Sequence, residues 1–457
     1  MSTPFELCFE PETDFGDVRL GKRIQKMFNT MAANPGGTLP KKLEKTADLM
    51  GCYRFLNNKK VSHQAMIQSH RDHTIAQLAS TPRRILLVHD DTVLDFSDLD
   101  IYGLGQVGDG NGRGLYAHNS LAVEPGSRQP LGLWGQILHS RARAPKKEKR
   151  DDRRNRPSRE SRLWKDGVKD LPALAPGIQV VDVSDRGSDI AEYIDFEVSS
   201  GRQFIVRSMH NRTILPEEDG GIGKLHDLLE SLQSMGSYTL HVQATQTRQA
   251  RQAKMLVTWR AVQVVPPRQA RGDHGTQPIP LFAVMAVEAD APSKTDQIKW
   301  VLLTNLPVAS LAEARGIIDD YACRWVIEDY HKAMKSCCGV ENLQMTTLEG
   351  LSNAIGVLSV LAVHVLRLRW LARDPETAQE PASRHAEPLL VRVAAAYIKK
   401  PDWKAMTVWE FYIAVARMGG YVANPKKRPP GIVILCRGYI RLHERAEGAR
   451  MMQTEMC

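Results

Sequence analysis

The sequence lacks the features that would direct a protein out of a reducing compartment or into a membrane. Its seven cysteines form no Cys-x-x-Cys pair, and the acidic N-terminus has no apolar stretch typical of a secretory signal. The longest apolar run, residues 355–366, is too short to span a bilayer and is followed at once by charged residues. We therefore expect a cytoplasmic protein with reduced thiols, no membrane segment, and a buried helix over this run.

Internal repeats and compositional extremes are also absent. Hydrophobic residues make up 42% of the 457 positions and charged residues 25%, which excludes a mainly disordered or collagen-like chain. This length favours about three domains. The 61 Lys and Arg residues exceed the 52 Asp and Glu residues by nine, and this basic balance favours a polyanionic partner.

Most of the excess positive charge lies in one stretch, residues 141–165. It holds 12 Lys or Arg residues against 4 Asp or Glu residues. Two interpretations stay open: a solvated surface loop, or a loop that becomes ordered when it grips phosphates.

The N-terminal part is predicted to be helical to about residue 75. Apolar residues recur at helical spacing from Leu20 to Met31, with lysines and arginines between them. Pro35-Gly36-Gly37 ends this helix, and a second helical stretch is expected over residues 41–54. The pattern fits a plain helical bundle with solvated lysines, or a DNA-binding module whose cations lie beside the apolar stripe.

The central part of the chain alternates short apolar runs with turns, which predicts a sheet. Residues 85–88 and 179–183 are predicted to be buried strands that end in carboxylates, at Asp91 and Asp185. Further strands are expected at residues 115–123, 131–139 and 202–207, with several β-like runs between residues 225 and 304.

A glycine-rich loop follows the first of these strands. It contains a literal G-x-G-x-x-G over residues 103–108. We expect no dinucleotide site here, because no helix is predicted to begin at the loop and no βαβ unit follows it.

A long helix is predicted from residue 311 to about residue 335. At 100° per residue, Tyr321, Arg324, Glu328 and Lys335 share a stripe about 60° wide. Such a stripe can be a solvated face with a few ion pairs. The residues around it are apolar enough to be packed, however, and a buried carboxylate needs partners.

Two signals mark the C-terminal part. Residues 374–388 are polar and contain proline, which predicts a linker. Thr407-x-x-Glu410 is typical of a capping box, so we expect a helix from there to Gly419-Gly420.

Three carboxylates could converge in this arrangement: Asp91, Asp185 and Glu328. Carboxylate oxygens suit hard divalent cations such as Mg²⁺. Two such ions about 3.5–4 Å apart can stabilise the attacking and leaving oxygens of a phosphodiester.

The spacing Tyr-x2-Arg-x3-Glu-x6-Lys of the predicted stripe resembles the Y-R-E-K signature of bacterial insertion-sequence transposases of the IS-four group, Tn-five type. Residues 185–190 (DRGSDI) resemble that family's D-R-E-A-D-I segment around its second catalytic aspartate. Asp91-Thr92 resembles the first, with Asp90 in the preceding acidic position. The resemblance thus implies Asp91, Asp185 and Glu328 as the catalytic metal ligands of a DDE transposase.

The resemblance also implies contacts with DNA. Arg207 and Arg212 match arginines that grip the transposon end, and Trp300 matches a tryptophan that stacks on a flipped base. The phosphate-holding residues of the signature would be Tyr321, Arg324 and Lys335.

The implied fold is α/β, with an RNase H-like catalytic core of five mixed strands and flanking helices. A β-rich insertion at about 215–305 would interrupt a catalytic domain of residues 76–373. A helical domain of residues 1–75 would bind the transposon end, and helices in residues 374–457 would pair two protomers.

The implied reaction is cut-and-paste DNA transposition with two Mg²⁺ ions, for which Mn²⁺ can substitute. Hydrolysis and strand transfer would occur at terminal inverted repeats through a hairpin intermediate. The partners would be double-stranded DNA, both transposon ends and target, and a second protomer in the synaptic complex. The compartment would be the bacterial cytoplasm.

Two alternatives stay open from the residues alone. A metal-dependent nuclease would share the three acids but would need neither Trp300 nor an end-specific N-terminal domain. A non-catalytic repressor would bind transposon ends, yet it would have no need of three convergent acids.

Overall fold

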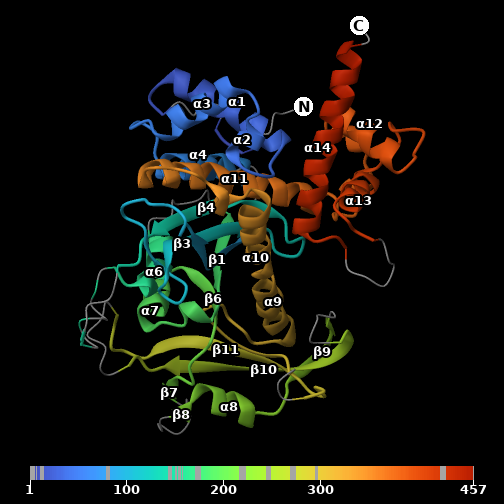
Figure 1. The fold of residues 1–457 in the computed structure, drawn as a ribbon. Coiled ribbons are helices and arrows are strands. Elements are labelled where there is room, and N and C mark those ends of the chain that lie inside the picture. Colours follow the sequence, from blue (N-terminus) through green and yellow to red (C-terminus); the bar gives the residue numbers. More distant parts are fainter. Residues whose placement is uncertain are drawn as a thin grey trace.

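The computed structural model describes residues 6, 8–10, 15–78, 83–142, 147–149, 152, 156, 158–169, 177–215, 223–242, 249–267, 274–293, 297–422 and 429–455. Helices from the two ends of the chain lie at one end of a mixed α/β core that is built on one large sheet, at the top of the view in Figure 1. Much of the basic stretch 141–165 lies outside the described residues, so neither interpretation of it is tested.

The N-terminal helices are α1 (Val18–Ala33), α2 (Leu39–Lys42), α3 (Thr46–Leu56) and α4 (His63–Leu78). Helix α1 begins at Asp17, whose side chain accepts the backbone N–H of Arg19, and the predicted apolar stripe is buried. Residues 41–54 do not form one helix. Leu43 ends α2, and α3 begins only at Thr46.

The first five long strands form the centre of the sheet in the order β4-β3-β1-β5-β6. Strand β1 pairs antiparallel with β3 and parallel with β5, and β5 pairs parallel with β6. A short strand, β2 (Gly105–Val107), also pairs with β3. The bounds of the five are β1 Arg83–Asp95, β3 Gly112–Val123, β4 Pro130–His139, β5 Ile178–Ser184 and β6 Gln203–Arg207.

The prediction that the first strand ends in carboxylates is wrong. Strand β1 continues to Asp95, because its pairing with β3 runs on to the partners Asp95 and Gly114. The two acids therefore lie inside a strand, where successive side chains point to opposite faces. Strand β5 does end immediately before Asp185, as expected.

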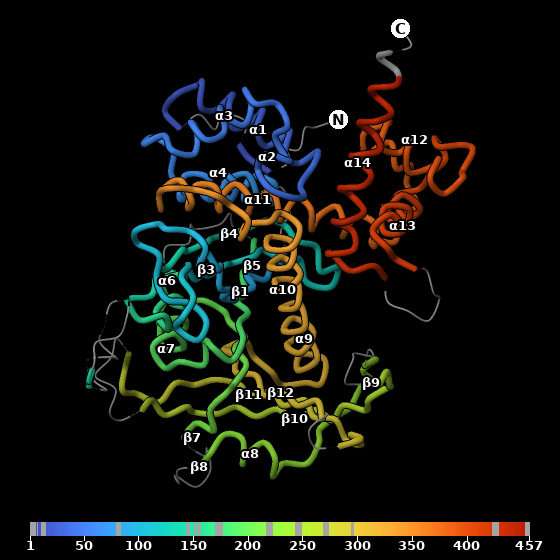
Figure 2. Tube along the Cα trace, in the orientation of Figure 1, coloured from blue at the N-terminus to red at the C-terminus, as the bar shows by residue number. Residues whose placement is uncertain are grey.

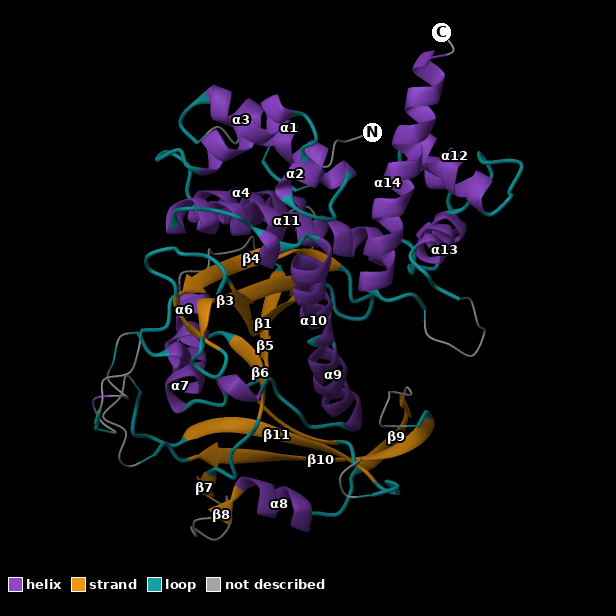
Figure 3. Cartoon of the chain, in the orientation of Figure 1, coloured by secondary structure: helices purple, strands orange, loops and turns teal. Residues whose placement is uncertain are grey.

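The β-rich insertion extends the same sheet. Strand β12 (Lys299–Thr304) pairs with β6, and β11 (Ile279–Glu288) and β10 (Arg251–Val264) follow, so the sheet has twelve strands rather than five. Figure 3 shows these strands crossing below the core strands. The smaller elements at this end are β7 (Thr213–Leu215), β8 (Gly223–Lys224), α8 (Leu225–Ser231) and β9 (Gly236–Val242).

Helices cover both faces of the central strands. On one side lie α6 (Leu163–Lys169) and α7 (Ala191–Ser199), and on the other α9 (Leu311–Ala322) and α10 (Trp325–Lys332) (Figure 3). The expected single helix from 311 to 335 is wrong. It breaks at Cys323 and Arg324, whose carbonyls accept N–H groups only three residues further on. After α10 the helix widens into a π-turn, Ala333–Cys337.

Helix α11 (Leu348–Leu371) lies between the N-terminal helices and β4 (Figure 1). By length and composition it could cross a membrane, but 83% of its most apolar window is buried inside the protein. The prediction of a buried helix over residues 355–366 is confirmed.

The C-terminal helices are α12 (Pro388–Tyr397), α13 (Val408–Met418) and α14 (Ile432–Glu455), which pack around a core of their own. The capping box of Thr407 and Glu410 and the end of α13 before Gly419 are confirmed. The predicted linker is more ordered than expected: it forms two 3₁₀ turns, Thr377–Gln379 and Ala382–Arg384. In Figure 2, the first turns of α14 lie beside the end of α11.

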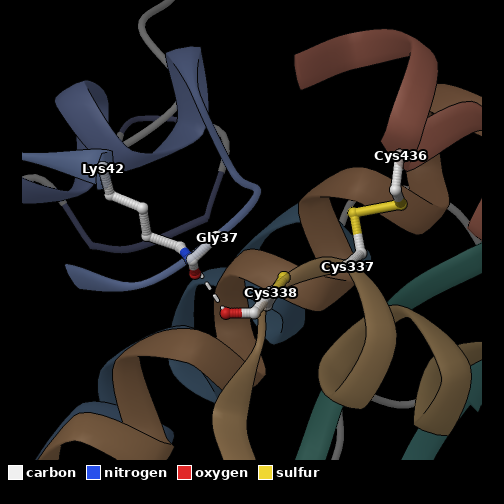
Figure 4. Close-up of a disulfide and its surroundings, with 5 residues drawn as sticks. All are labelled: Gly37, Lys42, Cys337, Cys338 and Cys436. Carbon is white, nitrogen blue, oxygen red and sulfur yellow. Dashed lines mark hydrogen bonds between the residues drawn. A yellow bond between two sulfur atoms is a disulfide. The ribbon is translucent and has the colours of Figure 1, made fainter. Parts of the chain in front are cut away.

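The prediction of reduced thiols is wrong for one pair. Cys337 and Cys436 form a disulfide with their Cα atoms 5.3 Å apart (Figure 4). Cys8, Cys52, Cys323 and Cys338 are buried free thiols, and Cys457 lies outside the described residues.

Candidate active site

The neighbouring acids of β1 face opposite sides of the sheet. Asp91 lies on the side of α6, where its Oδ1 accepts a hydrogen bond from His118 Nδ1 at 2.6 Å. The His118 ring in turn packs edge-on against Trp164 of α6, at 5.1 Å between ring centroids. Asp90 lies on the side of α10, which is the side that carries Glu328.

Arg324 connects Asp90 to Glu328. Its Nη1 donates to Asp90 Oδ2 at 3.2 Å, and its Nη2 donates to Glu328 Oε1 at 2.8 Å. The break between α9 and α10 places this guanidinium at the start of α10, directed at the sheet. Only 10% of the Arg324 side chain is exposed, so one buried cation holds the two carboxylates together.

Asp185 completes the acidic group from the end of β5. Its Oδ1 accepts the backbone N–H of Gly187 at 2.7 Å, which fixes the side chain at the start of a 3₁₀ turn. Burial and, after it, the negative charge of Asp185 raise the pKa of Asp90 from 3.8 to about 7, although the positive charge of Arg324 acts in the opposite direction. Asp185 therefore lies close enough to Asp90 for the two negative charges to interact.

The structure therefore places Asp90, and not the expected first acid Asp91, on the side of the sheet that carries Glu328. The resemblance assigned the first acid to Asp91 from the neighbouring Thr92, and that assignment stays a prediction, whereas the ion pair with Arg324 is made by Asp90. No signal in the residues could have decided between two adjacent acids, because either is compatible with a strand until its pairing is known.

Tyr321, Arg207 and Trp300 meet beside this group. Tyr321 is buried, and its ring packs edge-on against Trp300 with 5.2 Å between ring centroids. Burial raises the pKa of Tyr321, whereas the positive charges of Arg324 and Arg207 lower it. Arg207 donates to the Lys299 carbonyl at 3.2 Å.

These side chains also concentrate positive charge. Burial lowers the pKa of Arg207, and the nearby guanidinium groups of Arg186 and Arg324 act in the same direction. Three arginines next to three acids form a surface that can hold phosphates and cations side by side.

Lys335 lies further along the same chain segment, in the π-turn. Its Nζ is 3.3 Å from Glu341 Oε1, and Glu341 also accepts the backbone N–H of Asp95 at the end of β1. The structure places it beside the end of β1 rather than against Glu328.

Arg212 makes an internal ion pair with Asp189, and its expected contact with DNA stays a prediction. Its Nε donates to Asp189 Oδ1 and its Nη2 to the Asp189 carbonyl, both at 2.6 Å. The Arg212 side chain is 8% exposed and that of Asp189 is fully buried. The arginine is therefore committed to an internal ion pair that fixes the loop after β6.

Sequence reasoning missed a polar chain behind the acids. Asn119 is the cross-strand partner of Asp90, and its Nδ2 lies 3.1 Å from His331 Nε2 on α10. Gln136 on β4 donates to Asn119 Oδ1 at 2.7 Å. Burial, followed by the charge of Lys335, lowers the pKa of His331 to about 3, so this link is neutral. These hydrogen bonds hold α10, the helix that carries Glu328, against β1.

The donor set suits a hard cation, since Asp90, Asp185 and Glu328 offer only carboxylate oxygens. Among the described residues, however, no three acidic, cysteine or histidine side chains are close enough to hold one metal ion as they stand. The guanidinium of Arg324 lies between Asp90 and Glu328, where its positive charge balances the two carboxylates.

Two family models match the chain. One, described as a transposase DNA-binding domain, covers residues 11–61, and one described as a transposase DDE domain covers residues 179–365. The two matches support a DDE-type DNA transposase. The DDE match contains Asp185, Glu328 and the whole β-rich insertion, whereas β1 and both of its acids precede it. Such domains typically use divalent metal ions, and the DNA-binding match corresponds to helices α1 to α3.

Proposed function

We propose that this transposase belongs to the IS-four group, Tn-five type, and moves an insertion sequence by cut-and-paste transposition. The clustering of Tyr321, Arg324 and Glu328 beside Asp90 and Asp185 is the observation that carries the proposal. The order β4-β3-β1-β5-β6, with its antiparallel and parallel pairings, supports an RNase H-like core.

The proposed metal ligands are Asp90, Asp185 and Glu328, with Asp90 in place of Asp91. Two Mg²⁺ ions, or Mn²⁺ in their place, would activate the attacking oxygen and stabilise the leaving oxygen of a phosphodiester. The protein supplies the rest. Asn119 and His331 keep the Glu328 helix at the sheet, and Arg324 can leave the carboxylates for a phosphate of the bound end.

The nucleic acid would lie along the positively charged surface. Arg207, Tyr321 and Lys335 would hold phosphates of the transposon end, and the half-buried Trp300 would stack on a flipped base. Water would break one strand at the end and leave a 3′-hydroxyl. That hydroxyl would attack the opposite strand to give a hairpin, water would reopen it, and the hydroxyl would then join target DNA.

The proposed division of labour follows the three parts of the chain. Residues 1–75 would bind the end and residues 76–373 would carry the chemistry. Residues 374–457 would pair two protomers in the synaptic complex. The only helix among the described residues that is both long and apolar enough to cross a membrane is α11, which is mostly buried, and the proposal places the protein in the bacterial cytoplasm.

A labelled duplex that spans one terminal inverted repeat and its flank tests the proposal in the presence of Mg²⁺. We expect cuts at the repeat boundary, a hairpin-sized product, and loss of both in Glu328→Gln with end binding retained. Glu349→Gln, which changes an exposed carboxylate on α11, is the matched control and should cleave normally.

Other results would contradict the proposal in distinct ways. Cleavage by Glu328→Gln would refute the site assignment. Cuts scattered along any duplex would indicate a nuclease, and binding without cuts by the unmodified protein would indicate a repressor.

A further inference from the structure

Residues from the N-terminal and the C-terminal parts of the chain both contact the end of the turn that carries Lys335. Cys337, two residues after Lys335, is bonded to Cys436 on α14, 99 residues later (Figure 4). The next residue, Cys338, has its carbonyl bound by Lys42 Nζ from α2 at 3.0 Å. The N-terminal and C-terminal helices therefore both contact the two residues Cys337 and Cys338, just after the Y-R-E-K segment ends at Lys335.

The contact from the N-terminal side is closely packed. Lys42 is 2% exposed, and its Nζ also donates to the Gly37 carbonyl. Gly339 follows in the left-handed region at φ +66°, and a Cβ atom there would lie 3.0 Å from the Gly37 carbonyl oxygen. This side of the turn is fixed by hydrogen bonds and close backbone packing.

Lys335 itself contributes little to its own placement. Its only ion-pair partner among the described residues is Glu341, at 3.3 Å, and both side chains are about one third exposed. Exposed pairs of this kind are weak and screened by salt. The position of the ammonium group therefore depends on the backbone of the π-turn, a geometry that is rare and needs outside support.

We infer that the Cys337–Cys436 disulfide is a positioning device for Lys335, and that its reduction slows strand cleavage. The inference rests on the proposed function, in which Lys335 holds a phosphate of the transposon end. A dithiol reductant would supply two electrons and two protons. The S–S bond breaks, each cysteine sulfur gains a proton, and the reductant leaves as its own disulfide. The turn then keeps its support from Lys42 but loses its tie to α14.

The first measurement is the state of the bond and the cleavage rate together. Alkylation under non-reducing conditions followed by mass spectrometry reports whether Cys337 and Cys436 are bonded. Single-turnover cleavage of the end duplex, with protein saturating, is then compared with and without dithiothreitol. We expect reduction to lower the rate about 10- to 100-fold with the affinity for the end unchanged.

Variants separate positioning from general stabilisation. Cys436→Ser should cleave as slowly as the dithiothreitol-treated protein, and adding dithiothreitol should not change its rate further. Cys52→Ser, which removes a buried free thiol and keeps the disulfide, should respond as the unmodified protein does. Lys335→Ala should be slow in both redox states with no further loss on reduction, because the disulfide acts on chemistry only through Lys335.

Several outcomes would overturn the inference while leaving the proposed function intact. They are free thiols at both positions, equal cleavage rates in the two redox states, or a further loss on reduction of Lys335→Ala. Hydrogen exchange of the free protein gives a test that needs no cleavage. Amides of residues 333–338 should exchange faster in Cys436→Ser, and unchanged exchange would refute the inference. Failure of every form to cut the repeat would instead refute the proposed function.

Discussion

Asparagine substitutions at Asp90 and Asp91 separate the two faces of β1 most directly. The residues are adjacent, and both changes remove one negative charge while keeping the side-chain volume. Only Asp90 shares the side of the sheet with Glu328, through the bridging Arg324. We expect Asp90→Asn to abolish cleavage at the transposon end and Asp91→Asn to retain it.

The sizes of the two effects differ because the contacts differ. Loss of a cation-holding carboxylate should slow cleavage by about 10³-fold or more, which corresponds to about 4 kcal/mol of transition-state stabilisation. The amide oxygen of Asp91→Asn can still accept the hydrogen bond from His118. Its cleavage rate should stay within about threefold of the unmodified protein, because a neutral acceptor weakens that bond without removing it.

Asp90→Asn should lower activity but raise the stability of the folded protein. The folded-state pKa of about 7 exceeds the unfolded value of 3.8, so this carboxyl stabilises fully below pH 3.8 and loses that contribution as pH rises to 7. Three pKa units correspond to about 4 kcal/mol. In metal-free protein at pH 8, Asp90→Asn should therefore raise the free energy of unfolding by up to about that amount.

Single-turnover cleavage and urea unfolding in EDTA, measured on both variants, check these expectations. A stabilised but inactive Asp90→Asn beside an active Asp91→Asn is the expected pair. An active Asp90→Asn together with an inactive Asp91→Asn would refute the assignment of faces and restore the expectation from the sequence.

Two further predictions concern buried charge. Arg212→Gln should lower the free energy of unfolding by about 3–5 kcal/mol, because it leaves the buried Asp189 without its counter-ion; urea unfolding measures this, and weaker end binding by fully folded variant would contradict the internal role. His70 is fully buried and neutral, with its Nε2 accepting the Leu133 N–H, and burial lowers its pKa from 6.5 to about 3. Neutral His70 therefore contributes up to about 5 kcal/mol to the free energy of unfolding above pH 6.5, and this contribution is lost as the pH falls towards 3. Acid unfolding of His70→Gln should lack this loss, and an unchanged pH dependence would contradict it.

The catalytic strands were predictable because their apolar runs are short, continuous and bounded by turns. The side of the sheet that each side chain faces was not predictable, because it depends on how the strand pairs with residues far along the chain. Asp90 and Asp91 show the limit. Only the register that sets Asp90 opposite Asn119 and Asp91 opposite His118 decides which acid meets α10.

The helix of the signature shows a different limit. Spacing predicted that Tyr321, Arg324 and Glu328 share a stripe, and they do lie together, yet the helix breaks at Cys323 and Arg324. No glycine or proline marks that break. Nor does any local pattern pair Cys337 with a residue 99 positions later, because such a contact arises only when distant segments of the chain pack together.

Arg324 explains how Asp90 and Glu328 can lie close together before any cation binds. Its guanidinium neutralises Asp90 and Glu328 at once, and without it their repulsion and burial would disfavour the folded site. The same group is the best phosphate ligand in the cluster. When a phosphate of the end draws the guanidinium away, the carboxylates lose their internal counter-ion at the place where DNA has arrived. Affinity for divalent cations should then rise only on bound DNA, which would keep an otherwise indiscriminate cleavage site inactive until the correct substrate is held.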